Sequence, residues 1–283
     1  MNQIIIFRTI ADMRKQVGIW KSKNLSVGLV PTMGGLHEGH IALVEFAKKK
    51  CDRVITTIFV NPTQFGADED LAIYPRSEES DCQVIAGAGG AAVFIPSILE
   101  MYPEGFLTTV CVSGLTDKLC GASRPGHFDG VTQVVTKLLN QANADVAFFG
   151  EKDWQQLTII RRLAVDLNIP TSIKGVPTVR DVFGLALSSR NGYLDFKQIE
   201  KARLLSSVLS KAAYDIASGS DASFECAKVV KTLLGYGFDR IDYIECRNAH
   251  SLELIERADI AECRIFAAVY LGNIRLIDNY SIL

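Results

Sequence analysis

Continuous apolar runs recur along the first 180 residues, and a segment with helical periodicity follows most of them. The run 53–60 (RVITTIFV) is rich in β-branched residues and lacks polar alternation, which is typical of a strand buried on both faces of a parallel sheet. Similar runs occupy 26–32, 91–96, 145–150 and 171–179. Strands that alternate with helices predict βαβ units, so we expect an α/β fold with a Rossmann-like, doubly wound parallel sheet.

The intervening segments predict the crossover helices. In 40–50 (HIALVEFAKKK), the apolar residues Ile41, Val44 and Ala47 share one face, and three lysines lie in the last turn, where the helix dipole favours them. Further helices are expected over 77–89, 128–142 and 153–168.

The pattern changes near residue 180. Two helical segments, 197–218 and 221–235, precede apolar runs at 240–247, 264–271 and 273–279, and Gly272 between the last two predicts a hairpin. We therefore expect two domains, 1–178 and a smaller C-terminal α+β domain over 179–283. A chain of 283 residues that is 48% hydrophobic can bury two cores.

Charge and cysteine content exclude several classes of protein. The net charge is −2, from 30 basic and 32 acidic residues. The chain therefore lacks the excess of basic residues that would indicate a nucleic-acid partner. The uncharged stretch 82–99 contains glycines and a proline, which argues against a membrane span. The seven cysteines fit no zinc or disulfide spacing, and we expect reduced thiols and a cytoplasmic location.

The segment 31–40 (PTMGGLHEGH) is the first candidate site. It follows a predicted central strand and opens a helix, where ligands of open α/β sheets bind and where free N–H groups attract phosphate. His37 and His40 are three residues apart, not the four of a zinc-binding H-E-x-x-H helix. Phosphate binding is favoured on these grounds, while a metal site and a plain solvent loop stay open as alternatives.

Two further loops carry polar residues in comparable places. The segment 148–153 (FFGEKD) follows another strand and contains Gly150 and Lys152. The segment 185–194 (LALSSRNGYL) contains Ser188, Ser189 and Arg190 at the expected domain junction, and such a loop can clamp a phosphate. Each loop alone is a weak signal, but the three together favour a nucleotide site.

The segments PTMGGLHEGH, FVNPTQFG, YPRS, FFGEKDWQQL and LSSRNGYL, in this order, and RLIDN near the end, closely resemble the pantoate–β-alanine ligase family. This resemblance implies membership of the nucleotidyltransferase-like group, in which HEGH corresponds to a HIGH signature and LSSR to a KMSKS-type loop. It implies that ATP, accompanied by Mg²⁺, activates pantoate as pantoyl adenylate, and that β-alanine then displaces AMP. It also implies a homodimer and a C-terminal domain that acts as a lid.

The resemblance assigns roles to individual residues. The catalytic group would be His40, His37, Lys152, Arg190, Ser188 and Ser189. ATP would contact Met33, Gly34, Gly35, Leu36, His37, Glu38, Gly39, His40, Gly150, Glu151, Lys152, Asp153, Val179, Leu187, Ser188, Ser189 and Arg190, with Asp153 at the ribose. Gln64 and Gln156 would bind pantoate or β-alanine, with Asn61 in support.

Some positions depart from the family pattern or lack a clear role. Asp81 falls where some relatives hold a metal, but the neighbouring acid of those relatives is Ser80 here. For Arg124 and His127 we expect a structural or gating role, and His250 is expected at the surface. Two other functions stay in view, an adenylyltransferase for a phosphorylated acceptor and a nucleotide sensor without turnover. Two glutamines at the acceptor site argue against the first, and the intact cationic and histidine set argues against the second.

Overall fold

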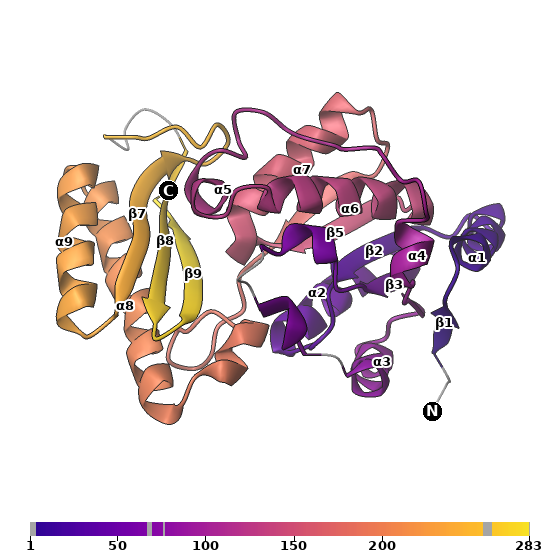
Figure 1. The fold of residues 1–283 in the computed structure, drawn as a ribbon, viewed down its shortest axis with the longest axis horizontal. Coiled ribbons are helices and arrows are strands. Elements are labelled where there is room, and N and C mark those ends of the chain that lie inside the picture. Colours follow the sequence, from indigo (N-terminus) through magenta and orange to yellow (C-terminus); the bar gives the residue numbers. More distant parts are fainter. Residues whose placement is uncertain (1–3, 67–69, 76, 257–261, 283) are drawn as a thin grey trace.

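The computed structural model describes residues 4–66, 70–75, 77–256 and 262–282. A parallel sheet of six strands forms the N-terminal part of the fold, in the order β1-β4-β3-β2-β5-β6 (Figure 1). Its strands are β1 (Ile5–Phe7), β2 (Val27–Thr32), β3 (Arg53–Ile58), β4 (Ala92–Phe94), β5 (Val146–Gly150) and β6 (Ser172–Val176). The expected doubly wound parallel sheet is thus confirmed.

The strand order reverses between β2 and β5, which are neighbours at the centre of the sheet. After β2 the chain adds β3 and β4 toward one edge, and after β5 it adds β6 toward the other. The connections that leave the carboxyl ends of β2 and β5 therefore diverge to opposite sides. A crevice between such connections is the usual ligand site of this architecture.

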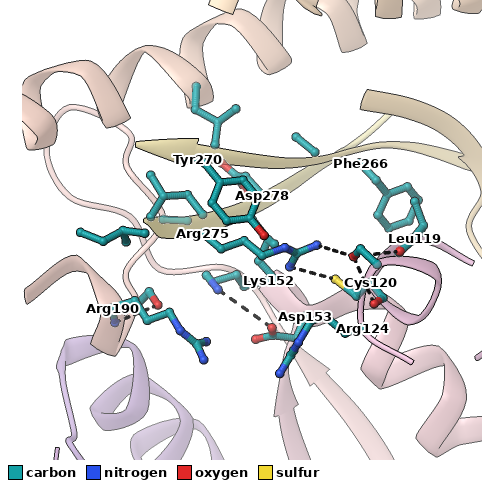
Figure 2. Close-up of a pocket in the computed structure, with 18 of the residues that line it drawn as sticks. Leu119, Cys120, Arg124, Lys152, Asp153, Arg190, Phe266, Tyr270, Arg275 and Asp278 are labelled. Carbon is teal, nitrogen blue, oxygen red and sulfur yellow. Dashed lines mark hydrogen bonds and ion pairs between the residues drawn. The ribbon is translucent and has the colours of Figure 1, made fainter. Parts of the chain in front are cut away.

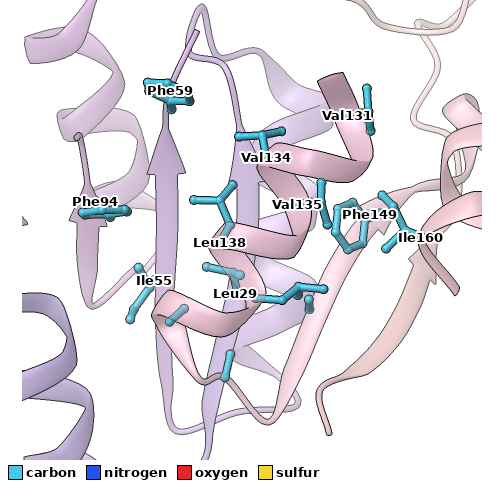
Figure 3. Close-up of a cluster of buried hydrophobic side chains, with 14 of the residues drawn as sticks. Leu29, Ile55, Phe59, Phe94, Val131, Val134, Val135, Leu138, Phe149 and Ile160 are labelled. Atoms are coloured by element: carbon cyan, nitrogen blue, oxygen red, sulfur yellow. The ribbon is translucent and has the colours of Figure 1, made fainter. Parts of the chain in front are cut away.

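Helices cover both faces of this sheet. They are α1 (Ile10–Ser22), α2 (Glu38–Lys48), α3 (Glu78–Gly87), α4 (Ile98–Met101), α5 (Leu119–Ser123), α6 (His127–Ala142) and α7 (Trp154–Asp166), with short 3₁₀ turns η1 (Pro62–Gln64), η2 (Asp70–Ala72), η3 (Glu151–Asp153) and η4 (Ser189–Tyr193). Figure 3 shows α6 across the sheet, with Val131, Val134, Val135 and Leu138 directed at Leu29, Ile55 and Phe149. These α6 residues have the i, i+3, i+4, i+7 spacing of one buried helix face.

The C-terminal part contains two helices and an antiparallel sheet. Its elements are α8 (Phe196–Ala217), α9 (Ala222–Gly235), β7 (Arg240–Asn248), β8 (Cys263–Leu271) and β9 (Ile274–Ser281), with strand order β7-β8-β9. The predicted hairpin is confirmed, and Gly272 adopts φ +58° at its tip, a conformation that suits glycine. In Figure 1 the sheet lies between these helices and the first domain, so β9 is close to the parallel-sheet loops.

The core divides into separate clusters. The largest joins α1, α6 and α7 to the parallel sheet, and a second joins α8 and α9 to the antiparallel sheet. A small cluster that includes Leu119, Leu252 and Phe266 bridges the two parts.

Several features lay outside the sequence expectations. The short edge strand β1 and helix α1 were not predicted, because a run of only four apolar residues and a helix of low amphipathicity give weak patterns. All seven cysteines are free thiols, and six of them are buried. Across the described ranges, no helix combines the length and apolar character needed to cross a membrane.

Candidate active site

A cavity of about 260 Å³ lies at the carboxyl ends of the central strands, in the crevice between β2 and β5. The predicted residues that line it are Met33, His37, Gly39, His40, Gln64, Gly150, Lys152, Asp153, Gln156, Val179, Leu187, Ser188, Ser189 and Arg190. A second cavity of about 1100 Å³ opens from it toward the C-terminal sheet and shares Lys152, Asp153, Gln156, Ser188 and Arg190 with it. Three loops that are distant in the sequence thus converge on one space.

Figure 2 shows the larger cavity, with Lys152, Asp153 and Arg190 on one side and Tyr270, Arg275 and Asp278 of the C-terminal sheet on the other. The sequence assigned no role to the residues on that second side. The segment RLIDN was the only signal for Arg275 and Asp278, and Tyr270 had none. Pairing of β9 with β8 does not reveal which loop of the parallel sheet β9 approaches.

The two histidines form the N-terminal cap of helix α2. His37 is the N-cap residue, and its Nδ1 accepts a hydrogen bond from the N–H of Gly39 at 3.1 Å. His40 Nδ1 accepts from the N–H of His37 at 3.4 Å, so the rings cap the helix reciprocally. A Cβ on Gly39 would lie 2.8 Å from Cε1 of His37, which explains why this position requires glycine. The spacing of HEGH is therefore the spacing of a capping box.

This cap determines which nitrogen of each ring is available to a ligand. A neutral imidazole whose Nδ1 accepts a hydrogen bond carries its proton on Nε2. His37 and His40 both line the cavity, and their ring centroids are 4.2 Å apart. Each histidine therefore has an Nε2–H donor that the helix cap does not use.

The surroundings keep both rings neutral. Burial is the main cause that lowers the pKa of His37, and the charge of Lys152 lowers it further. Burial also lowers the pKa of His40 to about 3, with contributions from His37 and Lys152. At neutral pH the two rings are hydrogen-bond donors rather than cations, and the fixed positive charges come from Lys152 and Arg190.

The low pKa of His40 predicts a pH-dependent stability. Below about pH 6.5 the unfolded chain takes up a proton on His40 that the folded chain does not, so the free energy of unfolding should fall as the pH falls. Between about pH 7.5 and 5.5 the loss from this residue should be about 1.4 kcal/mol. Urea unfolding at both pH values measures it. The His40→Gln variant should lack this part of the pH dependence, and an identical dependence in both proteins would contradict the assignment.

Asp81 holds the glycine turn that precedes the histidines. Its two carboxylate oxygens accept hydrogen bonds from the N–H groups of Gly35 and Leu36, both at 3.0 Å, and the residue is only 2% exposed. Gly34 and Gly35 adopt φ +88° and +62°, which lets the turn expose these N–H groups to the carboxylate. The suggested metal role does not fit this arrangement, because both oxygens are engaged in a buried structural contact. Within the ranges that the structure describes, no group of three or more His, Cys, Asp or Glu side chains is arranged to hold a metal.

The serine–arginine loop contacts the glycine turn directly. Ser189 Oγ donates to the carbonyl of Gly35 at 3.1 Å, and Ser188 Oγ caps η4 by accepting from the N–H of Arg190 at 3.3 Å. The N–H of Leu187 donates to the carbonyl of Val179 at 3.0 Å, which closes this loop on itself. The segments predicted to resemble HIGH and KMSKS motifs are therefore in contact.

The amide of Gln64 is oriented by its neighbours. Its Oε1 accepts from Asn61 Nδ2 at 3.1 Å, and Asn61 is itself fixed by the carbonyl of Gly130 and the hydroxyl of Tyr102. The Nε2 of Gln64 lies 3.0 Å from the sulfur of Met33, a weak acceptor. Gln64 thus presents a donor that a better acceptor can engage.

Arg124, at the end of α5, and His127, the first residue of α6, support the same segment. His127 Nδ1 lies 2.8 Å from the carbonyl oxygen of Gln64, which accepts only, so Nδ1 carries a proton. Arg124 also approaches this carbonyl, at 3.4 Å, and contacts His127 Nε2 at 3.0 Å. These contacts match the structural role expected for the pair, whereas gating stays a prediction.

The remaining predicted residues lie near the cavity without lining it. Gly34, Gly35 and Leu36 are in the glycine turn, Glu38 is the first residue of α2, and Glu151 is in η3. His250 is exposed, as expected, pairs with Glu262 at 2.9 Å and is not among the residues that line the two cavities.

Comparisons with known proteins agree with this geometry. The family described as pantoate-beta-alanine ligase matches residues 5–281. The chain belongs to this family. It is 53% identical to the pantothenate synthetases of Dinoroseobacter shibae and Paramagnetospirillum magneticum, over 98% of its length and 99% and 97% of theirs. The family resemblance predicted from the sequence is confirmed, and the chain is a ligase of pantothenate synthesis.

Solved structures of pantothenate synthetases are also similar. The enzyme from Thermus thermophilus superposes with a TM-score of 0.93 at 39% identity, and the match covers 99% of both chains. The pantoate-beta-alanine ligase from Francisella tularensis, complexed with beta-gamma ATP and beta-alanine, has a TM-score of 0.82 at 36% identity over 99% of this chain and 98% of its own. The same fold in that enzyme therefore accommodates a nucleotide and β-alanine.

Proposed function

We propose that this pantoate–β-alanine ligase works through a pantoyl adenylate. A carboxylate oxygen of pantoate forms a bond to the α-phosphorus of ATP, and pyrophosphate leaves. The amine of β-alanine then attacks the acyl carbon, AMP leaves, and the amine gives up a proton as the amide forms. The convergence of phosphate-binding groups and glutamines on one cavity carries this proposal, and the nucleotide and β-alanine of the Francisella enzyme support it.

The groups around the phosphates suit the first step. The Nε2–H groups of His37 and His40 donate to phosphate oxygens, while Lys152 and Arg190 compensate their charge. Phosphoryl transfer depends on positioned donors and cations more than on a strong base. Since both histidines are neutral at pH 7, they stabilise charge by hydrogen bonding and need not transfer a proton.

The other nucleotide contacts follow from the loop positions. Ser188, whose Oγ accepts from the N–H of Arg190, donates its hydroxyl hydrogen to phosphate, and Asp153 accepts from the ribose. Ser189 would do the same only by exchanging its hydrogen bond to the carbonyl of Gly35 for one to phosphate. Gly150, Val179 and Leu187 provide close backbone approach and apolar contact for the nucleoside. All of these residues line the cavity, which supports the assignment.

Gln64 and Gln156 bind the acid. An amide can donate to a carboxylate and accept from a hydroxyl, the two groups that pantoate presents. A site that binds a phosphorylated acceptor would require lysine or arginine at these positions. The two glutamines therefore favour the ligase over an adenylyltransferase. Magnesium enters as part of the MgATP substrate, since Asp81 is engaged by the backbone of the glycine turn.

The family resemblance also supports a homodimer in the cytoplasm, with a domain division between residues 178 and 179. The end of β6 at Val176 and the start of the second core cluster at Leu185 support that division. Light scattering of the purified protein measures the dimer directly.

Exchange of labelled pyrophosphate into ATP tests the proposed reaction. With MgATP present, exchange should require pantoate and should not require β-alanine, because adenylation precedes the second substrate. Exchange that is absent with pantoate would sink the proposal, as would exchange that β-alanine alone supports.

Removal of the Gln64 amide should weaken pantoate binding selectively. We expect Gln64→Ala to raise the KM for pantoate by about 10- to 100-fold, the effect of a lost hydrogen bond to a charged group. The KM for ATP should change little, since Gln64 is at the end of the cavity that we propose binds pantoate and makes no contact with the nucleotide. Steady-state kinetics with each substrate varied measures both values, with the exposed Gln83→Ala as control. An unchanged KM for pantoate would refute the assignment.

A further inference from the structure

Two consecutive side chains of β9, Asp278 and Asn279, are buried beside the site without belonging to the groups assigned above. They are 4% and 3% exposed, and both border the larger cavity. They form the end of RLIDN, a segment of the family resemblance to which no role was given. Buried polar side chains are retained only where hydrogen bonds compensate their desolvation, so their partners indicate what they do.

Asn279 contacts the turn that carries Lys152. Its Nδ2 donates to the carbonyls of Glu151 at 3.0 Å and Lys152 at 2.9 Å, more than 120 residues earlier in the chain. Its Oδ1 accepts from Arg264 Nε at 2.7 Å. These contacts use both amide hydrogens, so the orientation of the amide is fixed.

The turn itself has little internal support. Residues Glu151–Asp153 form a single 3₁₀ turn between β5 and α7, and Gly150 before it provides no side-chain cap. Trp154, which follows, donates its indole N–H to the carbonyl of Ala249 at 2.7 Å, and Arg264 lies over its ring at 3.8 Å. Two contacts from the C-terminal part therefore hold the Lys152 turn, one to Trp154 and one from Asn279. Only the contact from Asn279 is made to the backbone of Lys152 itself.

Asp278 makes the corresponding contact with the serine–arginine loop. Its carboxylate accepts two hydrogen bonds from Arg180, at 2.6 and 2.8 Å, and Arg180 also donates to the carbonyl of Gly184 at 3.0 Å. Arg180 and Ala186 form an isolated antiparallel β-bridge, and Ala186 lies two residues before Ser188 in the serine–arginine loop. Two adjacent residues of one strand thus support both cation-bearing loops.

We propose that Asn279 is a positioning residue for Lys152, and that with Asp278 it makes β9 the element that sets the spacing of the two ATP-binding loops. The inference rests on the proposed function of Lys152 as a phosphate ligand. Its physical basis is rigidity: a lysine side chain is flexible, so its ammonium group is accurately placed only when its backbone is fixed. The contact also explains why a segment distant from the nucleotide loops is part of the family pattern.

The Asn279→Asp variant isolates the donor function. Aspartate has nearly the same shape and keeps an oxygen for Arg264, but it replaces the NH₂ group by an oxygen that faces two carbonyl oxygens. We expect it to raise the dissociation constant for MgATP by about tenfold, a typical coupling between residues in contact. Asn279→Ala removes the same donors without adding charge, and it should act in the same direction.

Isothermal titration with MgATP in the absence of pantoate, where no turnover occurs, tests the proposal. Each Asn279 variant is measured alone and together with Lys152→Ala. If Asn279 acts through Lys152, its substitution should weaken binding in the wild type and have little effect once Lys152 is absent. Thr158→Val is the matched control, because Thr158 makes another buried contact with the C-terminal part, to the carbonyl of Ala249 that Trp154 also engages, but none with the backbone of the turn.

The outcomes separate the two proposals. Wild-type affinity in both Asn279 variants would overturn the positioning role, as would a loss of equal size in the Lys152→Ala background. A Thr158→Val loss equal to that of the Asn279 variants would also overturn it, by showing that domain contact in general is required. Should Asn279→Asp fail to fold, the same cycle with Asn279→Ala decides. Pyrophosphate exchange by the wild type tests the reaction itself independently of these variants.

Discussion

Alanine at position 40 is expected to lower pantoate-dependent pyrophosphate exchange by about 10²-fold, the usual cost of removing one preorganised donor from a developing negative charge. The Nδ1 of His40 is engaged in the helix cap, and its Nε2–H is the group available to phosphate. Because the ring is neutral, the loss is that of an oriented hydrogen bond and not of a positive charge.

Stability should change much less than activity in this variant. The cap contact from the N–H of His37 is lost, which costs about 1 kcal/mol. Thermal unfolding of His40→Ala therefore shows whether the fold is intact while the exchange assay measures the chemistry. His40→Gln can place an amide N–H near the Nε2 position and should retain more activity than His40→Ala.

The matched control is His250→Ala, which removes an exposed histidine that pairs with Glu262 and does not line either cavity. It should exchange pyrophosphate like the wild type. Near-normal exchange by His40→Ala, or an equal loss in His250→Ala, would remove His40 from its assigned role.

Local patterns sufficed to predict the parallel sheet and the strand-to-helix turn that carries His37 and His40. Strand β3 is a continuous β-branched run, and HEGH marks a strand-to-helix turn, so both are determined by neighbours in the sequence. The handedness of βαβ units limits the possible strand orders, and the observed order places β2 beside β5 at the centre of the sheet. The convergence of His40, Lys152 and Arg190 at a sheet switch point is a consequence of this order.

Contacts between distant segments were the part that local patterns could not predict. The metal role of Asp81 was suggested only by its position in the family pattern, and its partners in the structure are the N–H groups of Gly35 and Leu36, 46 and 45 residues earlier. Asn279 belongs to the segment RLIDN of the family resemblance, yet its contact with the Lys152 turn depends on how the antiparallel sheet docks on the parallel-sheet part of the fold. Docking of one domain on another leaves no periodic signal in the sequence.

Alanine at Gly130 is expected to destabilise the protein by about 3 kcal/mol, although alanine is normally the better residue in a helix. Gly130 lies in α6 directly against η1. A Cβ there would be 2.4 Å from the carbonyl oxygen of Thr63 and 2.6 Å from Cα of Gln64, both backbone atoms that cannot rotate away. The helix and the turn must separate, and the separation costs packing on both.

The same substitution should also impair pantoate binding. The carbonyl of Gly130 accepts from Asn61 Nδ2, and Asn61 orients the amide of Gln64. Displacement of η1 therefore disturbs the end of the cavity proposed to bind pantoate. His40, at the end proposed to bind the nucleotide, is held by α2. Chemical denaturation measures the stability, and the KM for pantoate against that for ATP measures the selective effect.

Gly18→Ala is the control, because Gly18 also lies inside a helix but a Cβ there would meet nothing within 4 Å. It should stabilise the protein by about 0.5–1 kcal/mol through helix propensity alone. If Gly130→Ala were as stable as Gly18→Ala, α6 could not lie as close to η1 as described. If glycine-to-alanine substitution raises the free energy of unfolding at position 18 and lowers it at position 130, then close backbone approach, and not helix propensity, determines the residue at position 130.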